Sequence, residues 1–150
     1  MPFQDKIVIT RNPAETMELA AEVARELEDH AILALRGDMG SGKTCFVRGL
    51  AFALGIECTV NSPTFTIVNE YRGHRLLYHV DLYRLTSPED VLAFGFEELL
   101  ETRAIIAIEW AENARDLIPD GTIDISLKCL EAPDEREIII RRTRHTQTPL

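Results

Sequence analysis

The sequence predicts an α/β fold with a parallel central sheet that is flanked by antiparallel strands. Two continuous apolar runs, 31–35 and 104–108, suit strands that are covered on both faces. A glycine-rich segment, 37–44, lies between the first run and an apolar helical stretch. The chain alternates strand and helix early and then ends in strand-like segments, which is typical of a parallel core with antiparallel additions.

The first elements are a short strand over 7–9 and a capped helix. Asn12 can cap this helix, Pro13 has the fixed φ that suits a first turn, and Glu15 completes the spacing of a capping box. Apolar residues then recur at i, i+3, i+4 and i+7 up to Leu27, and the charged residues fall mostly between them. The pattern therefore predicts a helix with one apolar face.

The middle of the chain predicts a buried helix, a hairpin and a further short helix. The stretch 45–54 is apolar nearly all round and ends at Gly55, a residue suited to terminate a helix. Segments 65–71 and 75–81 are strand-like and flank a glycine-containing turn, which predicts a hairpin. A helix start at Ser87 begins another short helix, which a glycine interrupts.

The last third of the chain predicts three more strands. The apolar run 104–108 is followed by an antiparallel pair, 122–129 with 137–141, around a proline-containing turn. The tail 143–150 has no periodicity and is expected to fray. No repeat, low-complexity segment or linker divides the sequence, so residues 1–150 are expected to form a single domain.

Composition and charge exclude several classes of protein. The 150 residues include 16 Lys and Arg against 25 Asp and Glu, so the formal net charge is −9. This balance disfavours a stand-alone nucleic-acid binder and docking on an anionic membrane. Hydrophobic residues make up 45% and charged residues 27%, which is ordinary for a folded soluble chain and argues against disorder.

No segment predicts membrane insertion or export. No apolar run approaches the ~20 residues that a transmembrane helix needs, and the N-terminus lacks the basic and apolar regions of a signal peptide. Cys45, Cys58 and Cys129 are widely spaced and odd in number, which indicates neither a disulfide framework nor a zinc site. We therefore expect a reduced, cytoplasmic location.

The segment from Gly37 to Thr44, GDMGSGKT, matches the phosphate-binding pattern G-x-x-x-x-G-K-[ST]. Its glycines let successive backbone N–H groups point at phosphate oxygens, and the helix that follows adds its positive end. Lys43 supplies a point charge to the β and γ phosphates, and the Thr44 hydroxyl can ligate Mg²⁺. A strand before and a helix after the loop favour a nucleotide site in a P-loop NTPase-like three-layer fold.

Two acidic residues are candidates for the carboxylate that a phosphate loop needs for Mg²⁺. Asp81 ends the strand 76–80, and Glu109 ends the strand 104–108. Glu109 follows the longer apolar strand and so better fits a carboxylate that binds metal or orients water. Asp81 is expected to reach Mg²⁺ directly or through water, and the alternative for each residue is a strand-end cap or a solvated charge.

Three further features remain open from the residues alone. The hydroxyl-rich segment 62–66 suits a γ-phosphate sensor or, alternatively, a turn stiffened by proline. Trp110 suits stacking near the nucleotide or a place in the core. His79 lies in a strand close to Asp81, and a structural histidine is the expected interpretation.

The motifs together resemble the TsaE (YjeE) family. They are GDMGSGKT at 37–44, SPTFTIVNEY at 62–71, HVDLYRL at 79–85 and IEW at 108–110. Their order and spacing match the family over about residues 12–141. The phosphate loop alone is generic, whereas the second and third motifs are specific to this family.

The resemblance implies an ATPase that serves the threonylcarbamoyladenosine (t6A) modification of tRNA, at the adenosine beside the anticodon. Family members work with TsaD, which transfers the threonylcarbamoyl group, and with TsaB. Hydrolysis is weak alone and stronger in the complex, where it resets the complex between turnovers. The cofactors implied are ATP or ADP and Mg²⁺, and tRNA is reached indirectly, through the complex.

The resemblance also implies roles for individual residues. Lys43, Asp81 and Glu109 form the catalytic set, and Thr44 joins the two carboxylates at the metal. Adenine contacts are expected near Asn12 and Arg136 by position only. The full set expected to contact nucleotide is Asn12, Asp38, Met39, Gly40, Ser41, Gly42, Lys43, Thr44, Cys45, Thr64, Trp110 and Arg136.

Two other functions fit the phosphate loop. A small-molecule kinase needs a lid with arginines that clamp phosphates, and Arg84 and Arg115 are available although no arginine-rich segment stands out. A nucleotide-gated docking module would use nucleotide to order segment 62–66, with hydrolysis incidental.

Overall fold

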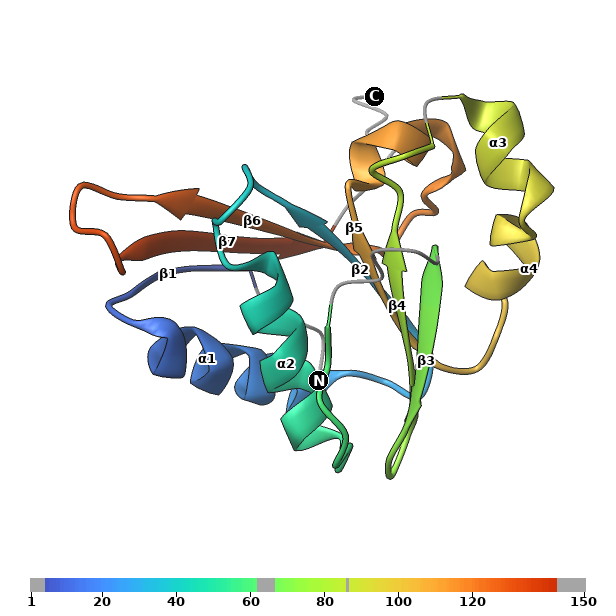
Figure 1. The fold of residues 1–150 in the computed structure, drawn as a ribbon. Helices are drawn as coiled ribbons and strands as arrows, with labels where there is room; N and C mark the ends of the chain where they lie inside the picture. The colour runs from blue at the N-terminus through green and yellow to red at the C-terminus, as the bar shows by residue number, and fades with distance from the viewer. Residues whose placement is uncertain (1–4, 62–66, 86, 143–150) are drawn as a thin grey trace, which may run out of the picture.

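A seven-stranded sheet lies between two layers of helices in the computed structural model, which describes residues 5–61, 67–85 and 87–142 (Figure 1). Within these residues the elements follow one another as β1 (Lys6–Thr10), α1 (Pro13–Glu26), β2 (Ala31–Arg36), α2 (Lys43–Ala53), β3 (Val68–Arg72), β4 (Leu76–Asp81), α3 (Pro88–Ala93), α4 (Phe96–Leu100), β5 (Ile105–Glu109), the 3-10 helix η1 (Ala111–Leu117), β6 (Ile123–Cys129) and β7 (Arg136–Arg142). The expected three-layer α/β fold is confirmed.

The strands lie in the order β1-β7-β6-β2-β5-β4-β3. β2 pairs in parallel with β5 and β6, and β4 pairs in parallel with β5. The β3–β4, β6–β7 and β1–β7 pairs are antiparallel, so the parallel centre with antiparallel flanks is confirmed. The strand expected over 65–71 begins at Val68, and residues 65 and 66 lie outside the described part of the chain, as does the tail 143–150.

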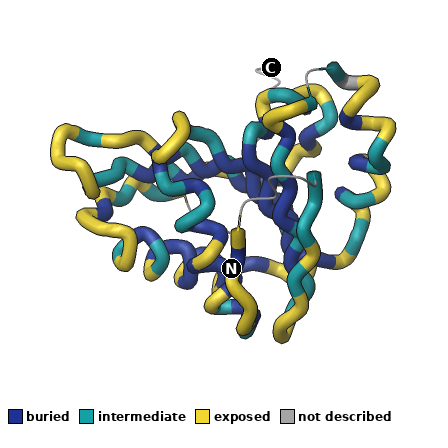
Figure 2. Tube along the Cα trace, viewed as in Figure 1, coloured by how far each residue is buried: buried dark blue, intermediate teal, exposed yellow. Residues whose placement is uncertain are grey.

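Each face of the sheet has its own hydrophobic core. α1 and α2 pack on one face over Leu33 and Leu35, and α3, α4 and η1 pack on the other over Ile106 and Ile108. β5 is buried along its whole length, as the central strands of Figure 2 show. Its continuous apolar sequence is explained by this coverage from both sides.

Local sequence explains how the first layer is assembled. Asn12 caps α1 by accepting a hydrogen bond from the Glu15 amide at 2.9 Å, and the Glu15 carboxylate accepts one from the Arg11 amide at 2.8 Å. α1 approaches α2 closely at Gly49, where a Cβ would lie 2.4 Å from the Met17 carbonyl oxygen. The missing side chain therefore lets the two helices touch.

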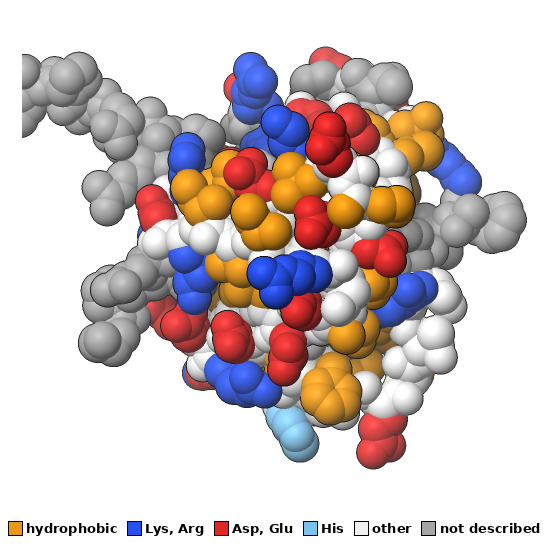
Figure 3. All heavy atoms as spheres, turned by 90° about the vertical axis from the view of Figure 1, so that its left-hand side faces the viewer, with side chains coloured by type: hydrophobic (Ala, Val, Ile, Leu, Met, Phe, Trp, Pro, Cys, Tyr) orange, Lys and Arg blue, Asp and Glu red, His pale blue; other side chains and the backbone are white. Residues whose placement is uncertain are grey.

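Two surface features differ from simple expectation. The sequence predicts a buried helix over 45–54, but Phe52 is 74% exposed, because only one side of α2 faces the sheet. Ile7 and Ile9 also alternate outward from β1. Figure 3 views the side that carries α1 and the β6–β7 hairpin, where apolar, acidic and basic side chains are intermixed. Among the described residues, no helix has the length and apolarity to cross a membrane.

Candidate nucleotide-binding site

The glycine-rich loop connects β2 to α2 at the edge of the sheet where the parallel strands end. Gly42 precedes α2 with a φ of +103°, a left-handed conformation that glycine adopts without strain. Lys43 begins the helix and is only 6% exposed. Its Nζ donates to the Gly37 carbonyl oxygen at 2.6 Å. The lysine thus folds back over the loop that is expected to bind phosphate.

Strand register brings the two candidate carboxylates together. β4 and β5 run in parallel with Asp81 opposite Glu109, so both side chains leave the sheet at the same edge. Glu109 is 4% exposed, and its Oε2 accepts a hydrogen bond from the Thr44 hydroxyl at 3.3 Å. The first turn of α2 and the end of β5 are therefore joined through these two side chains.

The Thr44–Glu109 pair has the chemistry of a magnesium site. Mg²⁺ prefers oxygen ligands and is usually held by one or two carboxylates, phosphates and several waters. The described residues contain no cluster of three or more His, Cys, Asp or Glu side chains that would enclose a metal. A hydroxyl and a carboxylate beside a phosphate loop fit an ion that is shared with a nucleotide.

Asp81 differs from Glu109 in its surroundings. It is half-buried, and its Oδ1 accepts a hydrogen bond from the Tyr83 amide at 2.9 Å. Burial raises the pKa of Asp81 above its ordinary value, and the neighbouring Glu109 charge adds to the rise, whereas the Tyr83 amide opposes it. Asp81 thus takes up a proton more readily than an ordinary aspartate does.

Trp110 has an unusual backbone directly after β5. Among the described residues it is the one non-glycine residue with a positive φ, at 59°. This left-handed turn lays its ring against Tyr83, at 4.9 Å between centroids, and beneath the Lys43 ammonium, which lies 4.2 Å from the ring centroid. Such strained positions concentrate at functional sites. The Trp110 ring is only partly buried, and the left-handed turn brings it into contact with the lysine of the phosphate loop.

Arg136 supports the loop from the antiparallel part of the sheet. Its Nε donates to the Ser41 carbonyl oxygen at 3.0 Å, and its Nη2 donates to the Gly40 carbonyl oxygen at 3.1 Å. β1 pairs with β7 so that Thr10 lies opposite Arg136. The pairing brings the turn before Asn12 to the same end of the sheet.

The other expected nucleotide contacts are spread around this loop. Met39 is 72% exposed, Ser41 is buried, and the Ser41 amide donates to the Asp38 carbonyl oxygen at 3.0 Å. The Cys45 thiol donates to the Pro13 carbonyl oxygen at 3.4 Å, which ties α2 to the start of α1. Thr64 lies outside the described residues.

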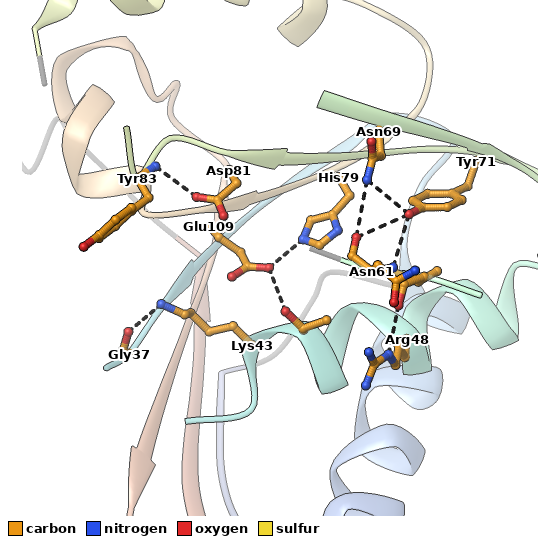
Figure 4. Close-up of polar contacts among 12 residues, drawn as sticks. Gly37, Lys43, Arg48, Asn61, Asn69, Tyr71, His79, Asp81, Tyr83 and Glu109 are labelled. Atoms are coloured by element: carbon orange, nitrogen blue, oxygen red, sulfur yellow. Dashed lines mark hydrogen bonds and ion pairs between the residues drawn. The ribbon is translucent and has the colours of Figure 1, made fainter. Parts of the chain in front are cut away.

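His79 contacts a residue of the candidate site, which the sequence interpretation did not predict. Its side chain is fully buried, and its Nε2 donates to Glu109 Oε2 at 2.6 Å (Figure 4). The histidine expected to be structural is therefore in direct contact with the candidate metal ligand. The signal was the strand period, because residues 79 and 81 must face the same side of a strand.

Three residues from neighbouring elements hold the chain just before segment 62–66. Arg48 on α2 donates to the Val60 carbonyl oxygen at 2.9 Å. Asn69 and Tyr71 on β3 both donate to the Asn61 carbonyl oxygen at 3.4 Å (Figure 4). β3 and α2 thus anchor residues 60 and 61 beside the site.

The chain is similar over most of its length to proteins of one family. The family described as "Threonylcarbamoyl adenosine biosynthesis protein TsaE" matches residues 10–138. The chain belongs to the TsaE family. The tRNA threonylcarbamoyladenosine biosynthesis protein TsaE of Treponema pallidum is 40% identical over 132 residues, covering 88% of this chain and 97% of that protein. The protein of the same name from Bacillus subtilis is 40% identical over 130 residues, covering 86% and 80%.

Solved structures agree with this membership. The crystal structure of Bacillus subtilis YdiB superposes with a TM-score of 0.81 at 32% identity, covering 96% of this chain and 89% of that one. The TsaE match begins before Asn12 and ends after Arg136, so it contains all the residues of the candidate site. The resemblance drawn from the four motifs is confirmed.

Proposed function

We propose that this TsaE-family chain is a Mg²⁺-dependent ATPase component of the t6A modification machinery of tRNA. The observation that carries the proposal is the meeting of Lys43, Thr44 and Glu109 where α2 begins and β5 ends. Buried charges at the end of parallel strands, beside a glycine-rich loop, are the arrangement that phosphoryl chemistry requires. The assignment to threonylcarbamoyladenosine biosynthesis is supported by the name of the family and by the names of the relatives.

The first task of the site is to bind phosphate. The loop amides and the amino end of α2 bind the phosphate oxygens, and Lys43 exchanges the Gly37 carbonyl oxygen for a β or γ phosphate oxygen. Trp110 stays beneath the ammonium and limits where it can move. Because Lys43 is almost fully buried, its charge acts through little intervening water.

The second task is to hold Mg²⁺ and to orient the attacking water, and it is divided between the two carboxylates. Thr44 and Glu109 would hold Mg²⁺, which neutralises phosphate charge when it is bound. Asp81 lies beside Glu109 in the strand register and is more exposed. Asp81 would orient the attacking water, and its raised pKa supports a role in accepting a proton during hydrolysis.

The partner proteins, rather than this chain, would bind the tRNA. A chain with a net charge of −9 is a poor electrostatic match for a polyanion, so TsaD and TsaB would hold the tRNA while this chain hydrolyses ATP beside them. Hydrolysis would then reset the complex between turnovers. In this arrangement ATP turnover depends on the partners.

The decisive experiment measures ATP hydrolysis by the purified chain, alone and with TsaB and TsaD. Strong stimulation by both partners, abolished by Lys43→Ala, would support the proposal. Equal turnover with and without partners would contradict it and favour a small-molecule kinase, which a search for phosphorylated products would then test. If a variant without hydrolysis still supported t6A formation, the docking-module alternative would hold instead.

A further inference from the structure

His79 occupies the strand position from which a side chain can reach Glu109. It lies on β4 opposite Ala107 of β5, and Asp81 lies opposite Glu109. His79 shares the face of Leu77, which belongs to the core beneath α1 and α2. The small Ala107 side chain leaves room for the imidazole to lean along β5 toward Glu109. The diagonal contact thus follows from register and side-chain size.

The contact fixes one oxygen of the Glu109 carboxylate. Oε2 accepts from His79 Nε2 at 2.6 Å and from the Thr44 hydroxyl at 3.3 Å. The other carboxylate oxygen points toward Lys43 (Figure 4). A carboxylate only accepts hydrogen bonds, so Nε2 carries the proton in this pair. His79 Nδ1 is buried with no hydrogen-bond partner among the described residues.

A purely structural role is a poor explanation for this pair. Burying an imidazole and a carboxylate is costly, and an apolar pair of similar size would be about as stable or more stable. The central strands supply such apolar residues at neighbouring positions, including Leu77 and Ile105. The polar pair occurs instead where Glu109 at the end of β5 bonds to Thr44 in the first turn of α2.

We propose that His79 is a positioning residue that holds Oε2 of Glu109, so that the other oxygen is presented to the magnesium ion of a bound nucleotide. This inference rests on the proposed function, since it takes a Mg²⁺–nucleotide as the ligand. Residues that orient metal ligands typically change metal affinity or activity by about 10–100-fold when they are replaced. His79 acts only through Glu109 and does not touch the nucleotide.

The test compares two amides of different reach. His79→Gln places its amide nitrogen near the position of Nε2 and retains the donor, whereas His79→Asn is one carbon shorter and cannot reach Oε2. The affinity for ADP is measured by calorimetry with Mg²⁺ and again with EDTA. We expect Mg²⁺ to tighten ADP binding nearly as much in the Gln variant as in the wild type. In the Asn variant, the factor by which Mg²⁺ tightens ADP binding should fall about 10–100-fold, while the affinity for ADP measured in EDTA should be unchanged.

Controls separate positioning from folding. His30→Ala removes a histidine whose Nδ1 lies 2.7 Å from the Thr102 carbonyl oxygen at the opposite edge of the sheet, and it should leave the magnesium gain intact. Thermal melting shows whether both His79 variants are folded at the assay temperature. A general loss of structure would weaken ADP binding equally with Mg²⁺ and with EDTA, which would overturn the inference.

Two further outcomes distinguish this inference from the proposed function. Equal magnesium gains in the Gln and Asn variants, with a normal gain in the wild type, would overturn the role of His79 and leave the ATPase proposal standing. A wild-type chain whose ADP affinity ignores Mg²⁺ would overturn both.

Discussion

The two ends of the parallel strands differ in where they keep their charges. At the carboxyl end, Lys43 and Glu109 are almost fully buried and are hydrogen-bonded. At the amino end, a cavity of about 490 Å³ opens between α1, α4 and the start of β6. Its acidic side chains are all exposed: Glu26, Glu28, Glu97, Glu101 and Asp120.

A cavity alone does not mark the functional edge of the sheet. Exposed carboxylates keep their hydration shells, so their presence at this end of the sheet costs little folding free energy. A buried charge costs several kcal/mol unless it is paired, and it persists only where a partner or a function requires it. At the amino end His30 and Arg142 bond to backbone carbonyl oxygens, which is a structural use of polar groups. The buried network therefore identifies the site better than the amino-end cavity does.

The largest expected effect comes from removing the buried ammonium. Lys43→Ala should lower ATP turnover in the proposed complex with TsaB and TsaD by on the order of 100-fold or more, because it removes the buried ammonium that bonds to the Gly37 carbonyl oxygen of the loop. Lys6→Ala is the matched control, since Lys6 pairs with Glu26 at 3.6 Å on the surface. Steady-state phosphate release measures both variants. Similar losses of ATP turnover in Lys43→Ala and Lys6→Ala would contradict a special role for the buried lysine.

An intermediate effect is expected from a matched pair of glutamates, one at each end. Glu109→Gln keeps the side-chain shape but loses the charge, so the tightening of ADP binding by Mg²⁺ should fall about 10–100-fold. Glu101→Gln at the amino-end cavity should leave that tightening unchanged. Calorimetry with Mg²⁺ and with EDTA gives both values. If the effect of Mg²⁺ on ADP binding depended on Glu101 instead, the metal would bind at the amino end of the strands, and the proposed site would be wrong.

The smallest effects concern pH and differ in sign. Burial raises the pKa of Asp81, so its ionisation destabilises the folded chain as the pH rises above the ordinary value of 3.8. Asp81→Asn should therefore raise the melting temperature of the nucleotide-free chain at pH 7 by roughly 1–3 °C. The gain should shrink as the pH falls toward 4.

Asp29 near the amino end provides the opposite case. Its hydrogen bond and ion pair with Arg103, at 2.6 Å, lower the pKa of Asp29, so ionised Asp29 adds stability that is lost as the pH falls below 3.8. Asp29→Asn should lower the melting temperature at pH 7, by less than about 1 °C because the pair is exposed. Melting curves between pH 4 and pH 8 test both variants, and shifts of the same sign would contradict the comparison.

Much of the fold was predictable because its signals are local. The capped start of α1, the apolar strands β2 and β5 and the loop from Gly37 to Thr44 all depend on neighbours in sequence. The outward position of Phe52 was not predictable, since an apolar helix does not reveal which of its sides meets the sheet. Arg136 was expected near the site by position only, and its bonds to the loop carbonyl oxygens required the β6–β7 hairpin to fold back.

The sequence by itself determined the element types, the phosphate loop and the identity of the charged residues near it, because periodicity and turn chemistry act between residues a few positions apart. Only the tertiary structure decided strand order, register and burial. His79 and Glu109 are 30 residues apart, and Arg136 and Gly40 are 96 apart. Contacts over such distances arise when separate segments pack on one sheet, and burial then determines which charged groups must be paired.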